Sequence, residues 1–453
     1  MIKINQVGAI YMAKDVKVVL IGNGGREHAI AELLVKSGAK LLAFMEAKNP
    51  GIAKLANNDI KISKLESFES LIEFAKGVDF AVVGPEAPLV VGVADALNSA
   101  GIPCVGPTIE AAQLEGSKIF TRELLDKYKI KSNVKYRYFK AMDGVNEWIK
   151  ELGLENVVVK PEGLTGGKGV KVFGDHLKNL DDVLNYCKSL IQQHMRFIIE
   201  EKLDGEEFTL QTFVDGTHVI PTPLVQDHKR AFEGDAGPNT GGMGSYSMED
   251  HLMPFITKED VEIALNDMKQ TIYALKKETG EQYKGFLYGQ FMKTKSSVKL
   301  IEYNVRFGDP EAMNVLAILE DNFVEICESI LDGNLKNNLK FQKQATVCKY
   351  LVPAGYPTNP REKVPIKVDT HKLDELGVKY YFASVNQIDD VIYTSKSRTM
   401  GILGLGSNLE EAEKLAEEGT KYVYGDLFHR KDIGTRQLLQ KRINHIKKIS
   451  NFN

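Results

Sequence analysis

The chain has 453 residues, of which 43% are apolar and 26% are charged, and its formal net charge is −3. This length exceeds what one hydrophobic core usually supports, so we expect two to four compact units. The near-balanced charge gives no field toward nucleic acid or a membrane surface, and no stretch approaches the ~20 apolar residues of a membrane-spanning helix. We therefore expect a soluble, multidomain protein that binds neither nucleic acid nor membrane.

The cysteine pattern indicates a reducing compartment. The four cysteines stand singly, without metal-ligand or redox spacing: Cys104, Cys187, Cys327 and Cys348. We interpret them as buried, reduced thiols, which predicts a cytoplasmic location. The N-terminal run lacks the long apolar stretch of a secretory signal, and Met12 is an alternative start. We expect a monomer or a weak homo-oligomer.

The first part of the chain alternates short β-rich runs with helical segments. The expected strands are 16–22, 41–46, 80–84 and 102–106, and the expected helices are 29–37, one near Leu71 and one from Val91. Alternation at these lengths predicts a parallel sheet covered by helices on both faces. We expect an N-terminal α/β domain at 17–116, preceded by an N-terminal extension at 1–16.

The first motif with chemical meaning is GNGGREH at 22–28, between a strand and a helix. Glycines let the backbone approach a ligand, and the N–H groups of a helix start suit a phosphate. A tight turn that binds nothing is one alternative. Because Glu46 stands about twenty residues on, where a ribose-binding acid would lie, a dinucleotide-dependent oxidoreductase is another.

A lysine–glycine loop follows an apolar strand in the run 157–174. Lys160 ends the strand, and Gly166, Gly167, Lys168 and Gly169 form the turn. Two ammonium groups and several backbone amides can surround a polyphosphate. The loop is not a P-loop, because glycine follows Lys168 where Ser or Thr is required. A hairpin lid fits better. The alternative is an exposed turn, but the apolar strand favours a buried, partnered Lys160.

The next β-rich run, 196–203, leads into Glu200, Glu201 and a glycine turn. Such a segment can serve as a hinge that offers backbone groups to an adenine edge and a carboxylate to ribose hydroxyls. By itself it fits a strand with a solvated acidic turn equally well.

A polar stretch with basic residues and a glycine-rich stretch follow, QDHKR at 226–230 and DAGPNTGGMG at 235–244. Glycines with nearby basic residues offer backbone donors to an anion, whereas a disordered surface loop is the alternative. We interpret His228 as a structural histidine without an acid–base role.

The most informative strand is IEYNVR at 301–306. Because strand side chains alternate, Glu302, Asn304 and Arg306 share one face. Carboxylate and amide oxygens are ligands that Mg²⁺ prefers, and a guanidinium clamps a carboxylate or phosphate. An amphipathic strand with a solvated ion pair is the alternative. The loop 307–311 that follows favours a shaped site, although Asp309 also suits a turn.

The last part of the chain, from about residue 341, alternates the strands 346–352 and 399–406 with a helix at 409–423. It ends in a basic helix whose residues 441–448 we expect to form a solvated face. A C-terminal domain is therefore expected at 341–453.

Six strings in this order resemble the glycinamide ribonucleotide synthetase family of ATP-grasp enzymes: GNGGREHA, GPEAPLVVG, VVVKPEGLTGGKGV, IIEEKLDGEE, QDHKRAFEGDAGPNTGGMG and YNVRFGDPE. The resemblance covers nearly the whole chain after Val16. It implies an α/β and α+β multidomain ATP-grasp fold. Besides the N-terminal parallel-sheet domain and the C-terminal α/β domain, it implies a central ATP-grasp domain at 117–135 and 206–340. It also implies a small ATP-lid domain at 136–205.

The resemblance also implies a ligase of de novo purine biosynthesis. ATP phosphorylates the carboxylate of glycine, and the amine of 5-phosphoribosylamine attacks the glycyl phosphate to give glycinamide ribonucleotide, ADP and phosphate. The ATP-binding residues it implies are Lys118, Lys160, Gly166, Gly167, Lys168, Gly169, Glu200, Glu201, Leu203 and Glu207. The substrate-binding residues it implies are Gly24, Gly25, Glu86, Asp227, Lys229, Asn239, Thr240, Gly241, Gly242, Arg306 and Asp309. Glu302 and Asn304 match the Mg²⁺ or Mn²⁺ ligands, and Arg306 and Lys160 the catalytic residues.

Some positions depart from the family pattern. Glu162 and Thr165 replace the usual aspartate and alanine of the lysine–glycine loop, and the run 396–398 replaces Gly-Gly-Arg. Gln290 stands where many ATP-grasp enzymes place a third, acidic metal ligand, which predicts a less negative metal site.

Three alternatives remain at this point. A related ATP-grasp ligase that uses formate or bicarbonate is the nearest. The oxidoreductase leaves the later motifs unused, and a non-catalytic nucleotide-binding module does not account for Arg306.

Overall fold

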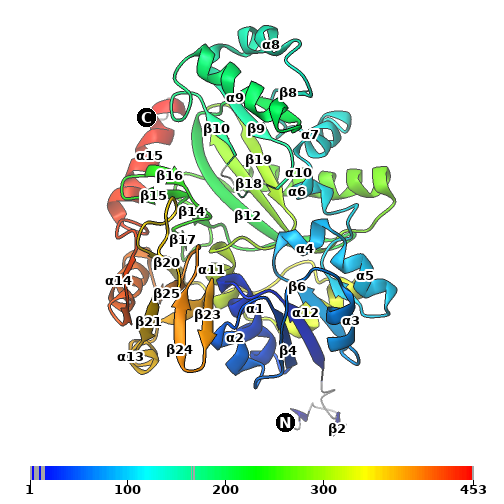
Figure 1. The fold of residues 1–453 in the computed structure, drawn as a ribbon, viewed down its shortest axis with the longest axis vertical. Coiled ribbons are helices and arrows are strands. Elements are labelled where there is room, and N and C mark those ends of the chain that lie inside the picture. Colours follow the sequence, from blue (N-terminus) through cyan, green and yellow to red (C-terminus); the bar gives the residue numbers. More distant parts are fainter. Residues whose placement is uncertain (1–2, 5–9, 12–15, 165, 167–168, 451–453) are drawn as a thin grey trace.

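A computed structural model of the chain describes residues 3–4, 10–11, 16–164, 166 and 169–450. The strands β1 (Lys3–Ile4) and β2 (Ile10–Tyr11) form a hairpin outside the main body. In the main body the N-terminal and C-terminal parts lie side by side at one end, a central sheet lies above them, and a small lid lies at the other end (Figure 1).

The N-terminal part is a five-stranded, fully parallel sheet with the order β5-β4-β3-β6-β7. Its strands are β3 (Lys17–Ile21), β4 (Lys40–Met45), β5 (Ile60–Ile62), β6 (Phe80–Val83) and β7 (Cys104–Val105). Its helices are α1 (Gly25–Lys36), α2 (Pro50–Leu55), α3 (Glu69–Phe74), α4 (Glu86–Val90) and α5 (Val93–Ser99). The predicted parallel sheet is confirmed, and its strands are apolar because helices cover both faces.

Two helix boundaries in this part differ from the prediction. Helix α1 begins at Gly25, four residues before the predicted start, and Glu27 Oε2 accepts a hydrogen bond from Gly24 N at 2.6 Å. The helix expected from Val91 begins at Val93 as α5, and the short helix α4 precedes it; Gly92, whose φ of 90° no continuous helix allows, separates the two.

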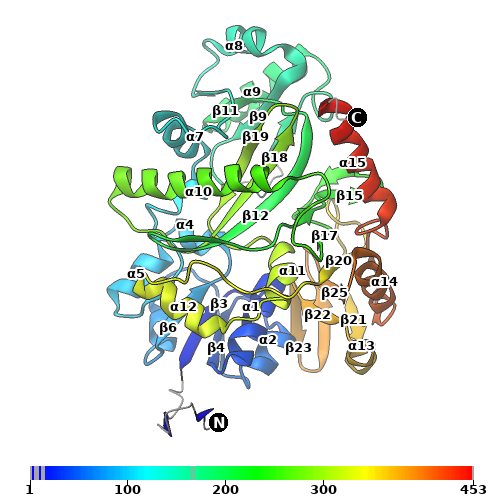
Figure 2. The same ribbon diagram turned by 180° about the vertical axis from the view of Figure 1, so that it is seen from behind.

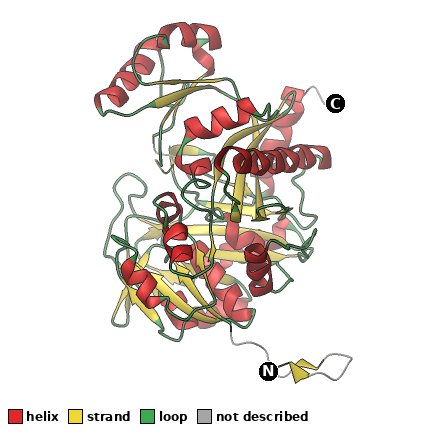
Figure 3. Cartoon of the chain, turned by 90° about the vertical axis from the view of Figure 1, so that its right-hand side faces the viewer, coloured by secondary structure: helices red, strands yellow, loops and turns green. Residues whose placement is uncertain are grey.

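The lid is a four-stranded antiparallel sheet with the order β10-β9-β11-β8. Its elements are β8 (Tyr136–Phe139), α8 (Val145–Leu152), the 3₁₀ turn η1 (Leu154–Asn156), β9 (Val157–Pro161), β10 (Lys171–Val172), α9 (Leu180–Gln192) and β11 (Phe197–Glu201). It has a hydrophobic core of its own around Trp148, Val159 and Phe197. The lid therefore forms a separate lobe (Figure 3).

The central part is a second antiparallel sheet with the order β13-β12-β18-β19. Its strands are β12 (Gly205–Asp215), β13 (Val219–Pro221), β18 (Lys284–Thr294) and β19 (Val298–Asn304). The helices next to it are α6 (Gln113–Gly116), α7 (Lys118–Lys127) and α10 (Lys258–Thr279). Helix α10 crosses one face of the sheet (Figure 2), which leaves the other face open toward the lid.

The C-terminal part contains a sheet with the order β14-β17-β20-β25-β22 and a smaller sheet with the order β23-β24-β21-β26. The first sheet and its partner β27 comprise β14 (Gln226–Asp227), β17 (Gly244–Ser247), β20 (Ala345–Pro353), β22 (Lys379–Phe382), β25 (Met400–Gly406) and β27 (Leu427–Phe428). The smaller sheet comprises β21 (Pro365–Val368), β23 (Val385–Ile388), β24 (Val391–Thr394) and β26 (Val423–Tyr424). The strands β15 (Arg230–Phe232) and β16 (Ala236–Asn239) form a separate hairpin.

Four helices and the terminal helix complete the main body. They are α11 (Glu311–Ala317), α12 (Phe323–Asp332), α13 (Thr370–Leu376), α14 (Leu409–Thr420) and α15 (Arg436–Ser450). Helix α14 ends before the predicted residue 423, because Val423 enters β26. Helix α11 packs on α1, so one hydrophobic core joins the N-terminal, central and C-terminal parts. No helix in the described part of the chain has the length and apolarity that crossing a membrane requires.

Candidate active site

Two adjoining cavities lie between the lid, the central sheet and the two terminal parts. Chamber I has a volume of about 280 Å³ and chamber II of about 450 Å³. The residues that line both chambers are Arg122, Lys160, Val170, Glu200, Asp227, Lys229, Thr240, Ile301 and Glu302. Because these residues are shared, the chambers form one continuous cleft.

Most of the residues predicted for substrates and ATP lie in this cleft. Those in chamber I are Glu86, Lys118, Lys160, Gly166, Glu200, Asp227, Lys229, Thr240, Gly241, Glu302, Asn304, Arg306 and Asp309. Those in chamber II are Lys160, Glu200, Glu201, Leu203, Glu207, Asp227, Lys229, Asn239, Thr240 and Glu302. Residues far apart in sequence thus meet here, such as Glu86 and Arg306, which are 220 residues apart.

Lys160 is held in the cleft by buried partners. Its Nζ lies 2.6 Å from Glu200 Oε2, and Arg122 binds the same carboxylate with contacts of 2.7 and 3.1 Å. Burial by itself would raise the pKa of Glu200, but Arg122 and Lys160 lower this pKa to about 2. The carboxylate is therefore ionised, and Lys160 is the buried, partnered lysine that the sequence predicted.

A β-bulge in β19 aims backbone carbonyls at these cations. Gln290 pairs with Glu302 whereas the next residue of β18 pairs with Leu300, so Ile301 is the extra residue. The Ile301 carbonyl accepts hydrogen bonds from Lys160 Nζ at 3.3 Å and from Arg122 at 2.9 Å. The bulge thus ties the lid lysine to the strand that carries Glu302.

Lys118 enters the cleft from the N-terminus of α7. Its Nζ donates to the carbonyl of Gly163 at 2.6 Å, and burial lowers the pKa of Lys118. The nearby Glu162 accepts hydrogen bonds from the Ser117 hydroxyl and from Ile119 N, the latter at 3.2 Å. The glutamate that departs from the family pattern therefore ties the lid loop to the start of α7.

Glu302 lies among several cations. Lys229 Nζ is 3.6 Å from Glu302 Oε1 and also donates to the side-chain oxygen of Gln290. Burial by itself would raise the pKa of Glu302, but Lys229, followed by Lys160, Lys118 and Arg306, lowers it. Gln290 donates in turn to Glu207, so the position predicted for a third metal ligand holds the surrounding side chains in place.

Arg306 extends beyond the end of β19 and binds two carboxylates. Its Nε lies 3.1 Å from Glu86 Oε2, and its Nη2 lies 3.1 Å from Glu115 Oε1. The pKa values of the two acids shift in opposite directions although both acids bind the same guanidinium. Burial raises the pKa of Glu115 to about 7, whereas Arg306 and then Arg26 overcome burial and lower the pKa of Glu86 to about 2. Two features account for the difference: Glu115 is more deeply buried, at 7% exposed against 33% for Glu86, and Arg26 lies 3.9 Å from Glu86.

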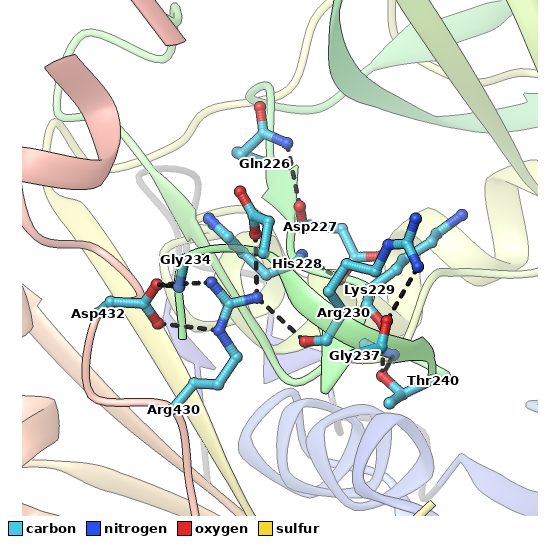
Figure 4. A network of polar contacts seen from close by, with 12 residues as sticks. Gln226, Asp227, His228, Lys229, Arg230, Gly234, Gly237, Thr240, Arg430 and Asp432 are labelled. Atoms are coloured by element: carbon cyan, nitrogen blue, oxygen red, sulfur yellow. Dashed lines mark hydrogen bonds and ion pairs between the residues drawn. The ribbon is translucent and has the colours of Figure 1, made fainter. Parts of the chain in front are cut away.

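The segment from Gln226 to Gly241 forms a wall of the cleft, and Figure 4 shows polar contacts within it. Thr240 donates to the Lys229 carbonyl at 2.9 Å and accepts from Gly242 N at 3.0 Å. Burial and the neighbouring Glu311 raise the pKa of Asp227. A Cβ on Gly242 would lie 2.8 Å from Asp227 Oδ1, so glycine is required for this close approach.

Arg398 fixes this wall from the C-terminal part. Its Nη1 donates to the carbonyls of Gly241 at 2.7 Å and Asp309 at 2.6 Å, and its Nη2 is 3.3 Å from Asp309 Oδ2. Sequence reasoning noted Arg398 only as part of a changed turn, yet it lines chamber I. Its contacts span 89 and 157 residues, which local pattern does not reveal.

Some predicted residues lie elsewhere. Within the described chain, Gly24, Gly25, Gly169 and Gly242 are not among the residues that line either chamber. A Cβ on Gly25 would lie 2.4 Å from the Tyr350 hydroxyl, so this glycine permits close packing of the N-terminal and C-terminal parts. Gly167 and Lys168 lie outside the described residues.

Chamber II combines an apolar pocket with polar ends. Its apolar walls are Val134, Val158, Val172, Met292 and Leu300. Leu203 and the acids Glu201 and Glu207 lie along its hinge side. A flat apolar ring fits between such walls, whereas the lysines at the junction with chamber I suit phosphates.

The oxygen ligands present in the cleft fit the predicted divalent metal site. In the described part of the chain, no group of three or more His, Cys, Asp or Glu side chains is arranged to hold a metal by itself. Mg²⁺ in nucleotide sites needs only one or two protein oxygen ligands, because phosphates and water supply the rest. The ionised Glu302 and the Asn304 amide oxygen, which share one strand face, meet this requirement.

The lid, the antiparallel sheet and the cation-lined cleft between them define an ATP-grasp protein, a class whose fold binds ATP and typically divalent metal ions. Family models described as phosphoribosylglycinamide synthetase match the chain three times: the N domain at 16–115, the ATP-grasp (A) domain at 116–312 and the C domain at 346–436. The chain belongs to the phosphoribosylglycinamide synthetase family.

Similar proteins carry consistent names. The phosphoribosylamine–glycine ligase of Methanothermobacter thermautotrophicus is 50% identical over 95% of this chain and 99% of its own. That of Pyrococcus furiosus is 51% identical over 96% and 98%. The crystal structure of the phosphoribosylamine–glycine ligase of Thermotoga maritima superposes with a TM-score of 0.78 at 27% identity, over 92% of this chain and 100% of that one.

Proposed function

We propose that this chain is a ligase that joins glycine to 5-phosphoribosylamine at the expense of ATP, giving glycinamide ribonucleotide, ADP and phosphate for purine synthesis. The observation that carries the proposal is the meeting of Lys160 with β19. The lysine donates to the Ile301 carbonyl at 3.3 Å, next to Glu302 in the same cleft. The cations that neutralise a triphosphate and the predicted metal ligands therefore lie side by side.

Chamber II is the proposed ATP site. The adenine would lie between its apolar walls against the hinge at Glu201 and Leu203, with Glu207 at the ribose. Lys160, at the junction with chamber I, and Lys118, inside chamber I, would bind the phosphates. Phosphoryl transfer depends on positioning and charge neutralisation more than on a side-chain nucleophile, so these lysines suit the reaction.

Glu302 and Asn304 would hold Mg²⁺ or Mn²⁺, and the metal would supply positive charge to neutralise the phosphates. Lys229 lies 3.6 Å from Glu302 and keeps the carboxylate oriented toward the cleft. Gln290 adds no negative charge beside it. The metal would therefore depend on the nucleotide for most of its ligands.

Chamber I is the proposed site of the acceptor chemistry. Arg306, oriented by Glu86 and Glu115, would bind the carboxylate of glycine as its oxygen attacks the γ-phosphorus and ADP leaves. The amine of phosphoribosylamine then attacks the acyl carbonyl and phosphate departs. Asp227 lines chamber I, and burial and Glu311 raise its pKa, so it would take the proton that the amine loses.

The lid would protect the acyl phosphate from water. An ion pair between Asp175 in the lid and Arg230 in the hairpin β15–β16 joins the two sides of chamber II. Water exclusion matters because hydrolysis of the intermediate would consume ATP without forming product.

Release of ADP tests the proposed function. ADP should appear only when glycine and freshly generated phosphoribosylamine are both present with ATP and Mg²⁺. Release that requires formate or bicarbonate in place of glycine would instead identify a related ATP-grasp ligase.

The predicted domain boundaries, the cytoplasmic location and the oligomeric state remain our expectations. Size-exclusion chromatography with light scattering measures the oligomeric state.

A further inference from the structure

The terminal helix α15 lies along the central sheet and reaches toward the lid (Figure 1). It begins at Arg436, where the match to the family C domain ends. The sequence predicted a solvated basic face for residues 441–448. That prediction is wrong for Arg442 and His445, because both line chamber II.

Arg442 joins two walls of chamber II. Its Nη1 lies 2.6 Å from Glu206 Oε2, next to the hinge, and its Nη2 lies 3.5 Å from Asp235 Oδ2, in the β15–β16 hairpin. The side chains of Arg442 and Glu206 are only 13% and 10% exposed. A fork-shaped guanidinium can hold two separate carboxylates in this way, whereas a lysine ammonium is a single point charge.

His445 holds the same hinge from the next turn of α15. Its Nδ1 lies 2.7 Å from Glu206 Oε1, and its Nε2 lies 3.2 Å from Asp204 Oδ1. The segment before α15 holds the hairpin. Arg430 lies 3.0 Å from Asp235 Oδ1, and Asp432 accepts from Gly234 N at 2.9 Å (Figure 4). The end of the chain thus fixes the hinge and the hairpin relative to each other.

The contacts of α15 affect ligand binding because they neutralise acidic side chains of chamber II. Other acids of the chamber have cationic partners on nearby elements, such as Glu200 with Lys160 and Asp175 with Arg230. Glu206 has its partners on α15. A triphosphate that enters this space is repelled by any carboxylate whose partner is removed.

We propose that α15 is part of the nucleotide site and that Arg442 is a positioning residue for ATP, because it neutralises Glu206 and Asp235 and holds the hinge against the hairpin. This inference rests on the proposed function only in taking chamber II as the ATP site. It adds a determinant of nucleotide affinity on a helix that follows the segments matched by the family models.

Calorimetric titration of the full-length protein with Mg²⁺ and ADP tests the inference without any ligation step. We expect Arg442→Gln to weaken ADP binding about tenfold, since the bridge between Glu206 and Asp235 is lost and Glu206 keeps only His445 as a partner. Arg442→Lys should bind ADP about threefold more weakly than the wild type, because a lysine reaches Glu206 but does not bridge to Asp235. Lys447→Gln, which removes an equal charge from an exposed position of the same helix, is the control and should bind ADP like the wild type.

Steady-state kinetics separates positioning from a general structural effect. The KM for ATP should rise about tenfold in Arg442→Gln, while the KM for glycine stays within about twofold of the wild type. Unaltered ADP affinity in Arg442→Gln, or an equal rise in both KM values, would overturn the inference. If Arg442→Gln does not fold, His445→Gln takes its place, with about threefold weaker ADP binding expected and wild-type affinity overturning the inference. A wild-type protein that binds ADP but ligates no glycine would refute the proposed function alone.

Discussion

Lys160 and Glu200 lie diagonally across the adjacent strands β9 and β11, with 2.6 Å between Nζ and Oε2. Lys160 is register partner of Ile198, and Glu200 is register partner of Val158. This diagonal contact brings the ammonium to the junction of both chambers while its charge stays compensated. Arg122 is a second partner for the same carboxylate, so Glu200 stays paired when Lys160 is removed.

Lys160→Ala should lower ADP release in the presence of both acceptor substrates at least about 100-fold, because one buried charge contact to the transferring phosphate is lost. The fold should persist, since Arg122 still neutralises Glu200. Coupled measurement of ADP together with thermal unfolding checks both statements. Lys188→Ala, an exposed lysine of the lid helix α9, is the matched control. Near-normal ligation by Lys160→Ala would remove Lys160 from the proposed site.

Glu302→Gln should raise the Mg²⁺ concentration needed for half-maximal activity at least about tenfold, because it removes the negative charge of the proposed metal ligand pair. Glutamine has nearly the same shape as glutamate, and Lys229 still has Gln290 as an acceptor. Activity titrated with Mg²⁺ at saturating ATP measures the effect, with Glu320→Gln as an exposed control. An unchanged Mg²⁺ requirement would show that Glu302 does not bind the metal.

Sequence reasoning found the cleft residues that stand at strand ends. Lys160, Glu302 and Arg306 follow or end apolar runs, where a charged side chain is unusual enough to signal a site. The parallel N-terminal sheet was predictable for a related reason, since its apolar strands and helical segments alternate at regular spacing.

Residues on helices escaped the same reasoning. Arg122 and Glu115 occur in ordinary helical patterns, and their roles arise from contacts with Ile301 and Val305 that lie 179 and 190 residues away. The fold brings these partners together. Gly25 shows a different case, because a Cβ at this position of the predicted phosphate-binding motif would lie 2.4 Å from the Tyr350 hydroxyl, a packing constraint that the motif by itself did not reveal.

The stability of the protein should depend on acid through Glu200. Its folded-state pKa of about 2 lies below the ordinary value of 4.5, so its contribution is complete above pH 4.5 and is lost as the pH falls toward 2. The loss amounts to about 3 kcal/mol for a shift of this size. Chemical unfolding between pH 6 and about 2.5 should show a flatter pH dependence of the free energy of unfolding for Glu200→Gln. Parallel curves for the two proteins would contradict this assignment.

Glu115 should couple glycine binding to pH. Burial, opposed by Arg306 and reinforced by Glu86, raises the pKa of this carboxyl from 4.5 to about 7. Above that pH Glu115 is ionised, so Arg306 is balanced by two carboxylates and attracts a substrate carboxylate less. The stability that protonated Glu115 provides is present below pH 4.5 and is lost as the pH rises through about 7.

The KM for glycine should therefore rise about threefold or more between pH 6 and pH 8 in the wild type. Glu115→Gln keeps a neutral side chain at every pH, so its KM for glycine should be nearly constant over this range. The KM for ATP, measured in the same series, is the internal control. A wild-type pH dependence that persists in Glu115→Gln would assign it to another group.

The contact between Asp175 and Arg230 should affect how tightly ATP consumption is coupled to product formation more than it affects the stability of the fold. Asp175 is 47% exposed, and exposed ion pairs of this kind contribute about 0–1 kcal/mol. The pair nevertheless joins the lid to the hairpin across chamber II, so its loss favours an open lid that admits water to the acyl phosphate. Asp175→Asn should raise the ratio of ADP released to glycinamide ribonucleotide formed by about twofold to fivefold, while the unfolding temperature changes little.

High salt should raise the same ratio in the wild type, because exposed charges are screened over about 3 Å at 1 M ionic strength. It should have little further effect on Asp175→Asn, which lacks the pair. Asp181→Asn, on the exposed start of the lid helix α9, changes an equal charge outside this contact and should leave the ratio at the wild-type value. If the Asp175→Asn ratio also equals that of the wild type, the ion pair does not hold the lid closed during turnover, and the partly buried contacts of Lys118 with Gly163 and of Lys160 with Ile301 are sufficient.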